Sequence, residues 1–564
     1  MADEEILRQL EESTRDARRV QRQTLAAILA RNSGVSYLQP YLLNDADPPM
    51  DPESFRRLVP ISSYDDYADY IQRLADGDTS SFLSVDPLLC FFSSSGTSTV
   101  RPKMIPYFDS KESKSASILV HQASAVILRR LFPPRPAITK ILWFIYAGQV
   151  TRTKGGLKVM AATAYPMQNN GPNATRIFSL CVSPPQILKS TEVHQQMYCH
   201  LLCGLRNYSS IDAIRAPYAL GLIRAFSLLE SKWEQLCKDI ECGSVSPEIT
   251  DPALRDSMQE FLDGPQYEIA LRIQAICEGS NWGGIFSKLW PNLRYVSCVL
   301  TGSMQQYYPK LRYYAGDVPL LGGDYFASEC AIAINLDRLK PPKTTRFVMI
   351  PNSAYFEFLP FDLATQEVGK ETADISSVEV GKIYEVVVTT YRGLFRYRLG
   401  DVVKVVGFYN AAPEIEFVTR IPKGAHEYAT EREVMLAVEN LQAKLKDRTG
   451  VDIIEFTSCW EIESTTKHLV IFVELNWVCE SVVLQGLCAS VESFLGDLYK
   501  AKRTDGKLGP LKISVVRTGS FDVLEKVALD DGAPASQYKL PKVLRSDKLT
   551  SILKDSVILT VSSD

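Results

Sequence analysis

The stretch FFSSSGTSTVRPKMIPY, residues Phe91 to Tyr107, decides how the rest of the chain is interpreted. Hydroxyl residues surround one glycine between Ser93 and Thr99, and Arg101 and Lys103 follow. Gly96 allows a tight turn, in which consecutive N–H groups form a concave donor site for an anion. The hydroxyls add donors, and Lys103 adds charge for phosphate oxygens. The stretch predicts an anion-binding loop of an α/β fold, with an ordinary polar turn as the alternative. It lacks the G-K-[ST] ending of a Walker A loop.

Length and composition restrict the class of protein. A chain of 564 residues is too long for one hydrophobic core, so two to four domains are expected, for example two unequal ones. The net charge is −4 with both signs interspersed, which argues against nucleic acid as a partner. No apolar run reaches the roughly 20 residues of a membrane span, and the charged N-terminus has no apolar signal core. We therefore expect a cytoplasmic protein that does not bind membranes.

Cysteine and histidine usage indicates reduced thiols and little metal chemistry. The 12 cysteines show no disulfide framework, which fits the cytosol. The segment CHLLC, Cys199 to Cys203, lies in an apolar helical stretch, where core packing is favoured over a metal site. Only five histidines are present, so a zinc cluster or a histidine-driven nucleophile has little support, although neither is excluded.

Hydrophobic spacing predicts the main elements. Glu4 to Arg31 is interpreted as one amphipathic helix, and Ser113 to Leu131 as another. Lys382 to Tyr409 is interpreted as an antiparallel meander with turns at Tyr391–Gly393 and Leu399–Asp401. After residue 419 helices and strands alternate as in a small α/β sandwich, beginning with a capping box at Thr430.

Five polar turns beside β-rich runs suggest one nucleotide site. They are SSSGTSTVRPK, TGSM, DYFASE, YFEF and YRLGD. The loop would hold phosphates, Asp401 would accept ribose hydroxyls, and Tyr355 would cover a base face. Glu329 could hold Mg²⁺, which favours carboxylate oxygens. In isolation, a structural turn acid is the favoured interpretation of Asp401 and of Glu329.

These motifs resemble a known family. SSSGTSTVRPKMIPY, YFASEC, YFEFLP and YRLGDVVKVVGFYN together resemble the plant GH3 acyl acid amido synthetases, of the firefly-luciferase-like adenylating superfamily. The resemblance extends over nearly the whole chain to SQYKLPK near the C-terminus. It implies a large N-terminal domain of β-sheets flanked by helices plus a β-barrel (residues 1–419), a hinge (420–425) and a mobile C-terminal α/β domain (426–564).

The resemblance also implies a reaction and its participants. An acyl acid attacks ATP, with Mg²⁺, to give an acyl-adenylate, and an amino acid then displaces AMP to give an amide. The implied partners are a small-molecule carboxylic acid and an amino acid, and the implied state is a monomer. Jasmonate or a relative is the favoured acid; auxin (indole-3-acetic acid) or a benzoate is the alternative.

The family's site residues carry over to this chain by motif. The implied ATP-binding residues are Ser94, Ser95, Gly96, Thr97, Ser98, Tyr325, Phe326, Ala327, Ser328, Tyr355, Arg398 and Asp401. Glu329 is the implied metal-binding and catalytic acid. Lys539 in QYKLPK is the implied catalytic lysine, which requires the small domain to close over the site.

One motif departs from the family pattern. Phe326 and Ala327 replace the small residue and first serine of the common Tyr-(Gly/Ala)-Ser-Ser-Glu. Phe326 could thereby reshape an acyl pocket whose other candidates, each also explicable as core, are Leu119, Val120, Ala123, Leu220 and Ile223. The departure keeps open a catalytically inactive ligand-binding regulator, and an acyl–CoA ligase also stays open.

Overall fold

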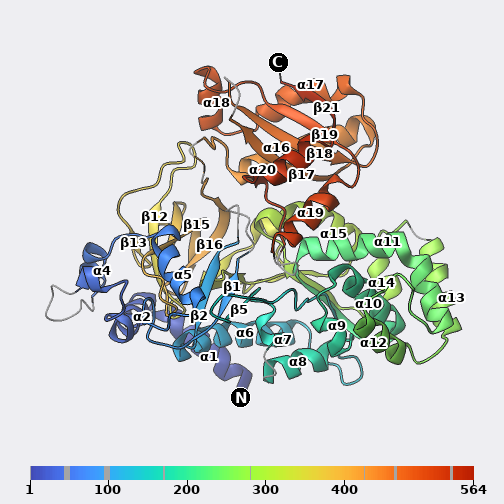
Figure 1. The fold of residues 1–564 in the computed structure, drawn as a ribbon, viewed down its shortest axis with the longest axis horizontal. Helices are drawn as coiled ribbons and strands as arrows, with labels where there is room; N and C mark the ends of the chain where they lie inside the picture. Colours follow the sequence, from blue (N-terminus) through green and yellow to red (C-terminus); the bar gives the residue numbers. More distant parts are fainter. Residues whose placement is uncertain are drawn as a thin grey trace.

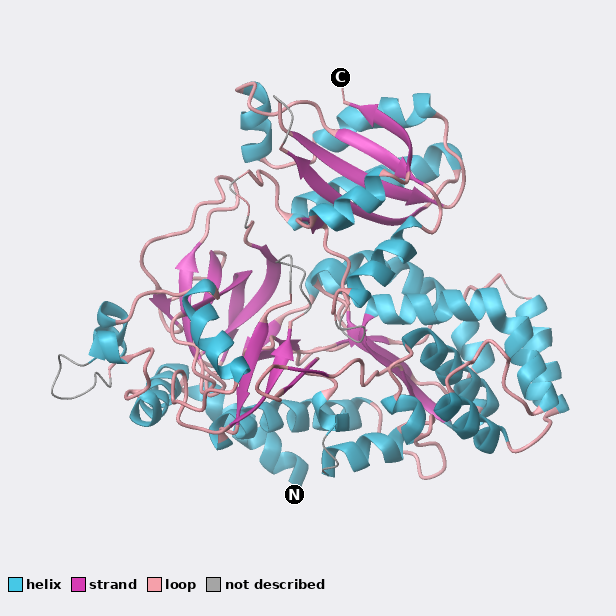
Figure 2. Cartoon of the chain, in the orientation of Figure 1, coloured by secondary structure: helices cyan, strands magenta, loops and turns pink. Residues whose placement is uncertain are grey.

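The computed structural model describes residues 2–42, 51–94, 102–168, 172–279, 281–422, 424, 426–462, 466–533 and 538–563. The chain forms a large N-terminal part and a smaller C-terminal lobe, drawn in orange and red at the top of Figure 1. The described residues form four sheets, three in the N-terminal part and one in the C-terminal lobe. Figure 2 shows helices packed around each of these regions.

The strands on either side of the Ser/Gly segment, β1 (Leu88–Ser93) and β2 (Met104–Phe108), belong to a four-stranded sheet. Strands β1 and β2 pair antiparallel, so the predicted loop is the connection of a hairpin. β1 also pairs in parallel with β5, whose residues 158–160 follow a Gly-containing loop. The order is β2 (Met104–Phe108), β1 (Leu88–Ser93), β5 (Lys158–Met160) and β4 (Thr151–Arg152).

A parallel sheet forms the second layer of the N-terminal part. Its neighbours run in the same direction, so their carboxyl ends meet at one edge, where α/β proteins bind ligands. Its strands are apolar because helices such as α10 (Val193–Arg206) and α11 (Ala219–Cys242) bury them. The order is β3 (Lys140–Trp143), β6 (Ile211–Tyr218), β7 (Tyr295–Val299) and β8 (Leu320–Gly322).

The predicted barrel corresponds to an eight-stranded antiparallel sheet, with β13 and β9 as its edges among the described residues. The turn predicted at Tyr391–Gly393 is confirmed: Gly393 has φ +79°, and a Cβ there would lie 2.3 Å from the Leu83 carbonyl oxygen. The order is β13 (Ala373–Asp374), β12 (Tyr355–Pro360), β14 (Ile383–Thr389), β15 (Tyr397–Tyr409), β16 (Ala412–Arg420), β11 (Phe347–Met349), β10 (Ala331–Ile334) and β9 (Tyr325–Phe326).

The turn predicted at Leu399–Asp401 is wrong. These residues lie inside β15, where the pairing shifts from Val387↔Arg398 to Glu385↔Val402 and leaves extra residues in β15. Gly400 takes φ +78°, which a glycine adopts without steric cost, and its carbonyl accepts the N–H of Ile421 at 2.8 Å. The glycine therefore makes a β-bulge rather than a chain reversal, and the bulge presents Asp401.

The C-terminal lobe is the predicted α/β sandwich. Its sheet mixes parallel and antiparallel pairs and packs against α16 and α17 through a core of aliphatic side chains. The strand order is β20 (Val543–Leu544), β17 (Ile453–Glu461), β18 (His468–Leu475), β19 (Lys512–Val516) and β21 (Val557–Ser562). Its helices are α16 (Glu431–Thr449), α17 (Ser481–Glu492), α18 (Asp497–Thr504), α19 (Ser520–Asp530) and α20 (Asp547–Lys554).

The helices of the N-terminal part include one correction. The single helix predicted over Glu4 to Arg31 is two, because Asp16 leaves the helical conformation and its carboxylate accepts the N–H of Arg19 at 3.0 Å as an N-cap. The helix predicted over Ser113 to Leu131 is confirmed.

The helices of the N-terminal part are α1 (Ala2–Arg15), α2 (Ala17–Asn32), α3 (Gln39–Leu42), α4 (Pro52–Leu58), α5 (Ala68–Asp76), α6 (Lys111–Leu131), α7 (Tyr165–Gln168), α8 (Pro172–Leu180), α9 (Pro185–Lys189), α10 (Val193–Arg206), α11 (Ala219–Cys242), α12 (Pro252–Leu262), α13 (Tyr267–Glu278), α14 (Ile285–Leu289) and α15 (Tyr308–Ala315). The 3-10 helices are η1 (Asp65–Tyr67), η2 (Tyr208–Ser210), η3 (Gly302–Tyr307) and η4 (Pro342–Thr344).

The capping box that begins α16 yields a stability prediction. The Thr430 hydroxyl accepts the N–H of Glu433 at 3.2 Å, and the Glu433 carboxylate accepts the N–H of Thr430 at 2.6 Å. Thr430→Ala is expected to lower the free energy of unfolding of the C-terminal lobe by about 1 kcal/mol, as loss of an N-cap does. Urea unfolding measures this, with exposed Thr504→Ala as a control expected to change by less than about 0.5 kcal/mol. Equal effects would contradict the capping role.

Candidate active site

The base of the predicted phosphate loop is a closed hairpin. The N–H of Ser94 donates to the carbonyl of Lys103, and the N–H of Lys103 donates to the Ser94 hydroxyl, both at 3.0 Å. The pairing explains why a serine stands at this position, since its side chain closes the hairpin. Four predicted loop residues lie outside the described part of the chain, and they are Ser95, Gly96, Thr97 and Ser98.

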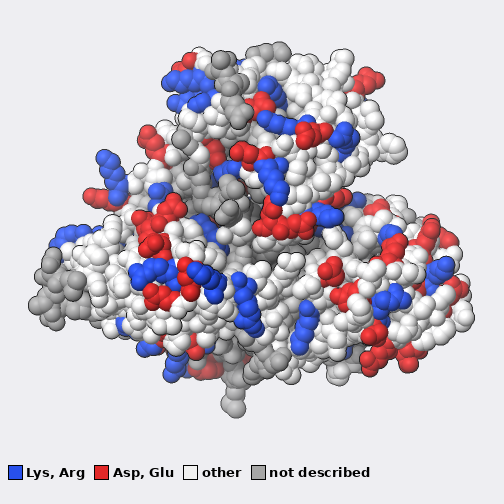
Figure 3. Space-filling view, in the orientation of Figure 1, with Lys and Arg blue, Asp and Glu red and all other residues white. Residues whose placement is uncertain are grey.

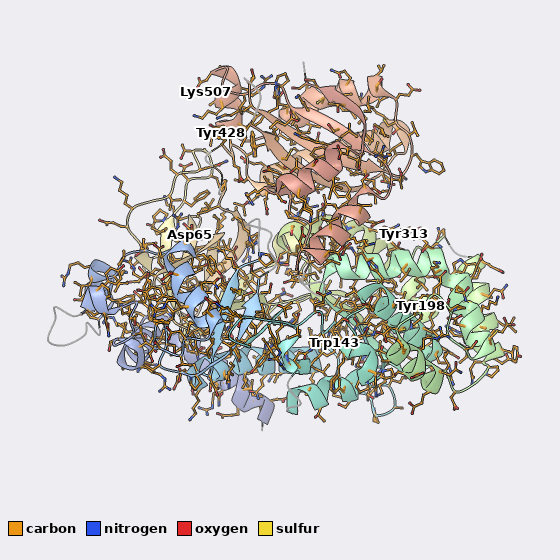
Figure 4. The ribbon with its side chains drawn as sticks, in the orientation of Figure 1. Asp65, Trp143, Tyr198, Tyr313, Tyr428 and Lys507 are labelled. Carbon is orange, nitrogen blue, oxygen red and sulfur yellow. The ribbon has the colours of Figure 1, made fainter. Side chains whose placement is uncertain are left out.

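Lys103 places its positively charged ammonium group in the candidate site. Its Nζ donates to the Tyr397 hydroxyl at 2.9 Å and lies 5.1 Å from the ring centre of Tyr64. Burial raises the pKa of Tyr397, so its hydroxyl stays protonated beside the ammonium. Asp65, whose charge also acts on Tyr397, lies on the side of the N-terminal part turned toward the C-terminal lobe (Figure 4).

Glu329 stands in the turn between β9 and β10. The turn is closed by the N–H of Ala327 donating to the carbonyl of Cys330 at 3.0 Å, and Arg392 donates to the carbonyl of Ser328 at 3.0 Å. Within the described residues, the Glu329 carboxylate has no hydrogen bond or ion pair. Burial raises its pKa, and the charge of Lys103 opposes that rise. A half-buried carboxylate without a protein partner suits a divalent cation.

The Asp401 carboxylate, on β15, contacts side chains from two other strands of the eight-stranded sheet, β9 and β16. The Tyr325 hydroxyl donates to one carboxylate oxygen at 2.7 Å, and Arg420 Nε donates to the other at 3.0 Å. Arg420 is the cross-strand partner of Asp401, so the register itself makes this ion pair. Asp401 raises the pKa of Arg420, and burial together with Asp401 raises that of Tyr325. Each carboxylate oxygen keeps a further lone pair for a ligand hydroxyl.

Two residues predicted to bind the nucleotide have protein partners in the structure. The Arg398 guanidinium binds Glu385, with N–O distances of 2.6 to 3.0 Å, and not Asp401. The Tyr355 ring is 1% exposed and packs edge-on against Phe55 in the core. A base cannot stack on that ring while the core is closed.

The predicted acyl-pocket residues separate into two cores. Val120 and Ala123 are fully buried beneath the eight-stranded sheet, whereas Leu220 belongs to the core of the parallel sheet. Leu119 is buried, and Ile223 is half-buried. For Val120, Ala123 and Leu220, packing alone accounts for the apolar residue type.

Phe326 is the accessible member of the predicted pocket. Its ring is 38% exposed and stacks on His121 of α6, with ring centres 4.9 Å apart and planes 12° from parallel. Burial lowers the pKa of His121, so the ring is neutral at pH 7. The sequence analysis missed His121, although it neighbours Val120 on a helix already assigned to the pocket.

Lys539 reaches the N-terminal part from the C-terminal lobe. Its Nζ lies 4.1 Å from the ring centre of Tyr218, the last residue of β6. The preceding residue, Tyr538, is buried, and the guanidinium of Arg224 lies 5.2 Å from its ring centre. The structure therefore brings a lysine of one lobe to the carboxyl edge of the parallel sheet in the other.

Charge at the surface is mixed. Figure 3 shows acidic and basic side chains interspersed over both lobes and along the seam between them, with no continuous field of either sign on this face. A small pocket at the seam is lined by both lobes, including Arg420, Glu431 and Arg545. The pocket thus lies next to the Asp401–Arg420 pair.

Comparison with known proteins identifies the family. Residues 6–320 match the GH3 family N-terminal domain, residues 347–420 the GH3 family central domain, and residues 432–548 the GH3 family C-terminal domain. The chain belongs to the GH3 family. This GH3 protein is 36% identical over 576 residues to the jasmonoyl--L-amino acid synthetase GH3.5 of Oryza sativa subsp. japonica, covering 98% of this chain and 97% of the relative.

Two further comparisons bear on activity and fold. The probable indole-3-acetic acid-amido synthetase GH3.6 of Oryza sativa subsp. japonica is 46% identical over 409 residues, which cover 68% of this chain and 82% of the relative. The solved structure of the GH3.15 acyl acid amido synthetase matches with a TM-score of 0.88 and 32% identity, covering 99% of this chain and 97% of that chain. The match confirms the α/β fold class with a large N-terminal part and a smaller C-terminal lobe.

Three other predictions from the sequence of this GH3 protein concern its cysteines, its CHLLC segment and membrane-spanning helices. All 12 cysteines are free thiols, so the absence of a disulfide framework is confirmed. Cys199, His200 and Cys203 are buried on α10, and His200 Nδ1 hydrogen-bonds the Ser183 hydroxyl at 2.7 Å, so this segment is core. In the described ranges, no helix combines the length and apolar character needed to cross a membrane.

Proposed function

We propose that this GH3 protein is an ATP-dependent acyl acid amido synthetase that forms an acyl-adenylate and transfers the acyl group to an amino acid. The observation that carries the proposal is the meeting of groups from both lobes at the strand ends. Glu329, which has no side-chain partner among the residues the structure describes, lies near the charges of Lys103 and Arg420, and Lys539 lies at the end of β6. Such a set suits a triphosphate and its metal better than a neutral ligand.

In the adenylation step, the carboxylate oxygen of the acid bonds to the α-phosphorus of ATP and pyrophosphate leaves. Two anions must approach each other, so the site has to neutralise charge. The loop after Ser94 and the Lys103 ammonium hold phosphate oxygens, while Lys539 faces the reacting phosphate from the other lobe. Glu329 would hold Mg²⁺, which neutralises phosphate charge when bound. Asp401 accepts ribose hydroxyls.

In the transfer step, the amine nitrogen of the amino acid bonds to the acyl carbon, AMP leaves, and the amine loses a proton. No protein nucleophile is required, which accords with the buried His200 and the neutral His121. The amine needs access to the side that Lys539 covers, so we propose that residues 420–425 act as a hinge that opens the C-terminal lobe between the two steps.

A single assay tests the proposed function. Purified protein is supplied with ATP, Mg²⁺ and a panel of acids, and pyrophosphate release is followed with amino acids or with coenzyme A as acceptor. Amide formation supports the proposal and names both substrates. Thioester formation would assign an acyl–CoA ligase instead. Absence of pyrophosphate with every acid would favour a ligand-binding regulator of the same fold.

The acid we favour is jasmonate or a relative, because the segments DYFASECAIAINL and GSMQQYYPKLRYYAGDVPL resemble the jasmonate-conjugating branch more than the auxin-conjugating one. Overall identity does not separate the two branches: the jasmonoyl--L-amino acid synthetase GH3.5 and the indole-3-acetic acid-amido synthetase GH3.8 are each 36% identical, over 98% and 99% of this chain. Auxin is the second candidate, because the probable indole-3-acetic acid-amido synthetase GH3.6 is 46% identical over the part that aligns. The acid panel therefore includes both, with benzoate as a smaller ring acid. We also propose a cytoplasmic location, which suits 12 free thiols.

Phe326 is predicted to influence the choice of acid. Phe326→Ala removes the ring that stacks on His121 and enlarges the space beside the turn. The ratio of kcat/KM for jasmonate to that for benzoate is expected to rise about tenfold, the usual scale of apolar pocket selectivity. The KM for ATP should stay unchanged. Steady-state kinetics measure both, with Phe408→Ala, an exposed ring at the far end of β15, as the control. A uniform change for all acids would contradict a selectivity role.

A further inference from the structure

Lys542 is a buried ammonium three residues after Lys539. Its side chain is 0% exposed, and its Nζ donates to Glu455 Oε1 and to the carbonyl of Phe456, both at 2.9 Å. A charge removed from water in this way persists only with a close partner of opposite sign. Glu455 supplies that partner from β17 of the same lobe.

Glu455 also faces the other lobe. Its second oxygen, Oε2, accepts the hydroxyl of Tyr307 at 2.6 Å, and the ring of Tyr307 lies with its centre 5.8 Å from Lys542 Nζ. Tyr307 ends η3 (Gly302–Tyr307), the 3-10 helix of the N-terminal part that follows β7 and includes the last three residues of TGSM. Burial and the Glu455 charge raise the pKa of Tyr307, so it remains a donor. One carboxylate therefore joins the buried lysine of its own lobe to a tyrosine of the other.

The segment that carries Lys539 is tied to this bridge. The carbonyl of Lys542 accepts the N–H of Ser458 at 3.0 Å, and the carbonyl of Pro541 accepts the Thr457 hydroxyl at 2.5 Å. Three residues of extended chain span at most about 10 Å. The position of Lys539 is therefore set within a short reach of Lys542.

Gln306 of η3 also donates to Glu455 Oε1, at 3.5 Å, whereas two further contacts between the lobes differ in kind. Lys343 and Glu439 form an ion pair at 2.7 Å, but both side chains are more than half exposed, and such pairs contribute little. Arg224 binds Glu525 and lies against Tyr538, but it belongs to α11, beside the predicted acyl pocket. The Tyr307–Glu455–Lys542 bridge connects the lobes without entering the proposed substrate site.

We infer that Tyr307 and Glu455 are positioning residues that hold the C-terminal lobe in the orientation that places Lys539 over the site. The inference rests on the proposed function, because it assigns the bridge to the adenylation step. The bridge joins the two lobes directly, so it has to break when the lobe opens for transfer. The free energy that the bridge contributes then sets the relative populations of the two orientations of the C-terminal lobe.

Tyr307→Phe removes the bridging hydroxyl and leaves both the ring and the Lys542–Glu455 pair. The kcat for pyrophosphate release is expected to fall by up to about tenfold, the scale of a lost hydrogen bond to a charged group, while the KM for ATP changes less than about twofold. Transfer to an amino acid from supplied jasmonoyl-adenylate should be unchanged or faster. Lys343→Ala, which breaks an exposed contact between the same lobes, should alter neither step.

Backbone hydrogen exchange of residues 538–544 gives a readout that needs no turnover. Exchange in this segment should be faster in Tyr307→Phe than in the wild-type protein and unchanged in Lys343→Ala. Glu455→Gln, which removes the charge that pairs with Lys542, should speed it further. Equal losses in adenylation and transfer, or unaltered exchange in Tyr307→Phe, would overturn the inference. A wild-type protein that releases no pyrophosphate would instead refute the proposed function, and the exchange result would still decide whether the bridge positions the segment.

Discussion

Lys539→Ala is expected to lower the rate of pyrophosphate release by about 10²–10³-fold, the usual cost of removing one preorganised charge that acts on a transition state. Negative charge builds on the reacting phosphate as the acid attacks, and Lys539 is the cation that the C-terminal lobe brings to the end of β6. The dissociation constant of ATP should change much less, because Ser94, Lys103 and Asp401 all lie in the other lobe.

The measurement for Lys539→Ala combines single-turnover pyrophosphate release with calorimetric titration of ATP. The control is Lys548→Ala, an exposed lysine of the same lobe that pairs only with Asp531 among the described residues. The control should match the wild-type protein in both assays. Equal losses of ATP binding and adenylation in Lys539→Ala would remove Lys539 from the proposed role.

Glu329→Gln is expected to lower kcat/KM for adenylation by about 10²-fold or more and to raise the Mg²⁺ concentration required for half-maximal rate, because an amide is a poorer ligand for a hard cation than a carboxylate. The Glu329 carboxylate has no partner among the described residues, so the substitution breaks no contact that holds the turn. The matched control is exposed Glu371→Gln, which should leave the Mg²⁺ dependence unchanged.

The pH profile separates a ligand role from a structural one. Burial raises the pKa of Glu329 above its ordinary value of 4.5, so the carboxylate protonates at a higher pH than an exposed glutamate does. If the ionised form is required, the rate rises with pH through that pKa, and this acid limb should vanish in Glu329→Gln. A profile that retains the limb in the variant would assign it to another group.

The sequence allowed the candidate residues to be listed but not all their contacts. Glu329, in a turn, and Asp401, at a bulge of β15, both stand in polar motifs that can be recognised from the sequence. Arg398 and Tyr355 stand in equally recognisable motifs, yet Arg398 binds Glu385 and Tyr355 is buried. Strand register decides which face of a sheet a side chain occupies. A bulge in β15 shifts its register against β14, and the local sequence pattern does not predict the size of that shift.

Apolar residues illustrate the same difference. Val120, Ala123 and Leu220 were reasonable pocket candidates, because pocket lining and core packing use the same residue types. Their burial in two separate cores could only follow from the arrangement of α6 and α11 around different sheets. Phe326 was distinguished by its departure from the family pattern, whereas its stacking on His121 depends on a helix about 200 residues away in the chain.

The sequence by itself determined the fold class, the hairpin loop as an anion-binding candidate, the acids at Glu329 and Asp401, and the lysine at 539. These follow from residue type and short-range spacing, which backbone geometry translates directly into turns, strands and helices. Only the tertiary structure decided which groups meet: Arg420 on Asp401, Lys539 on Tyr218, and Glu455 between Lys542 and Tyr307. Such meetings depend on the packing of two lobes and on strand register, and these are set by contacts between residues far apart in the chain.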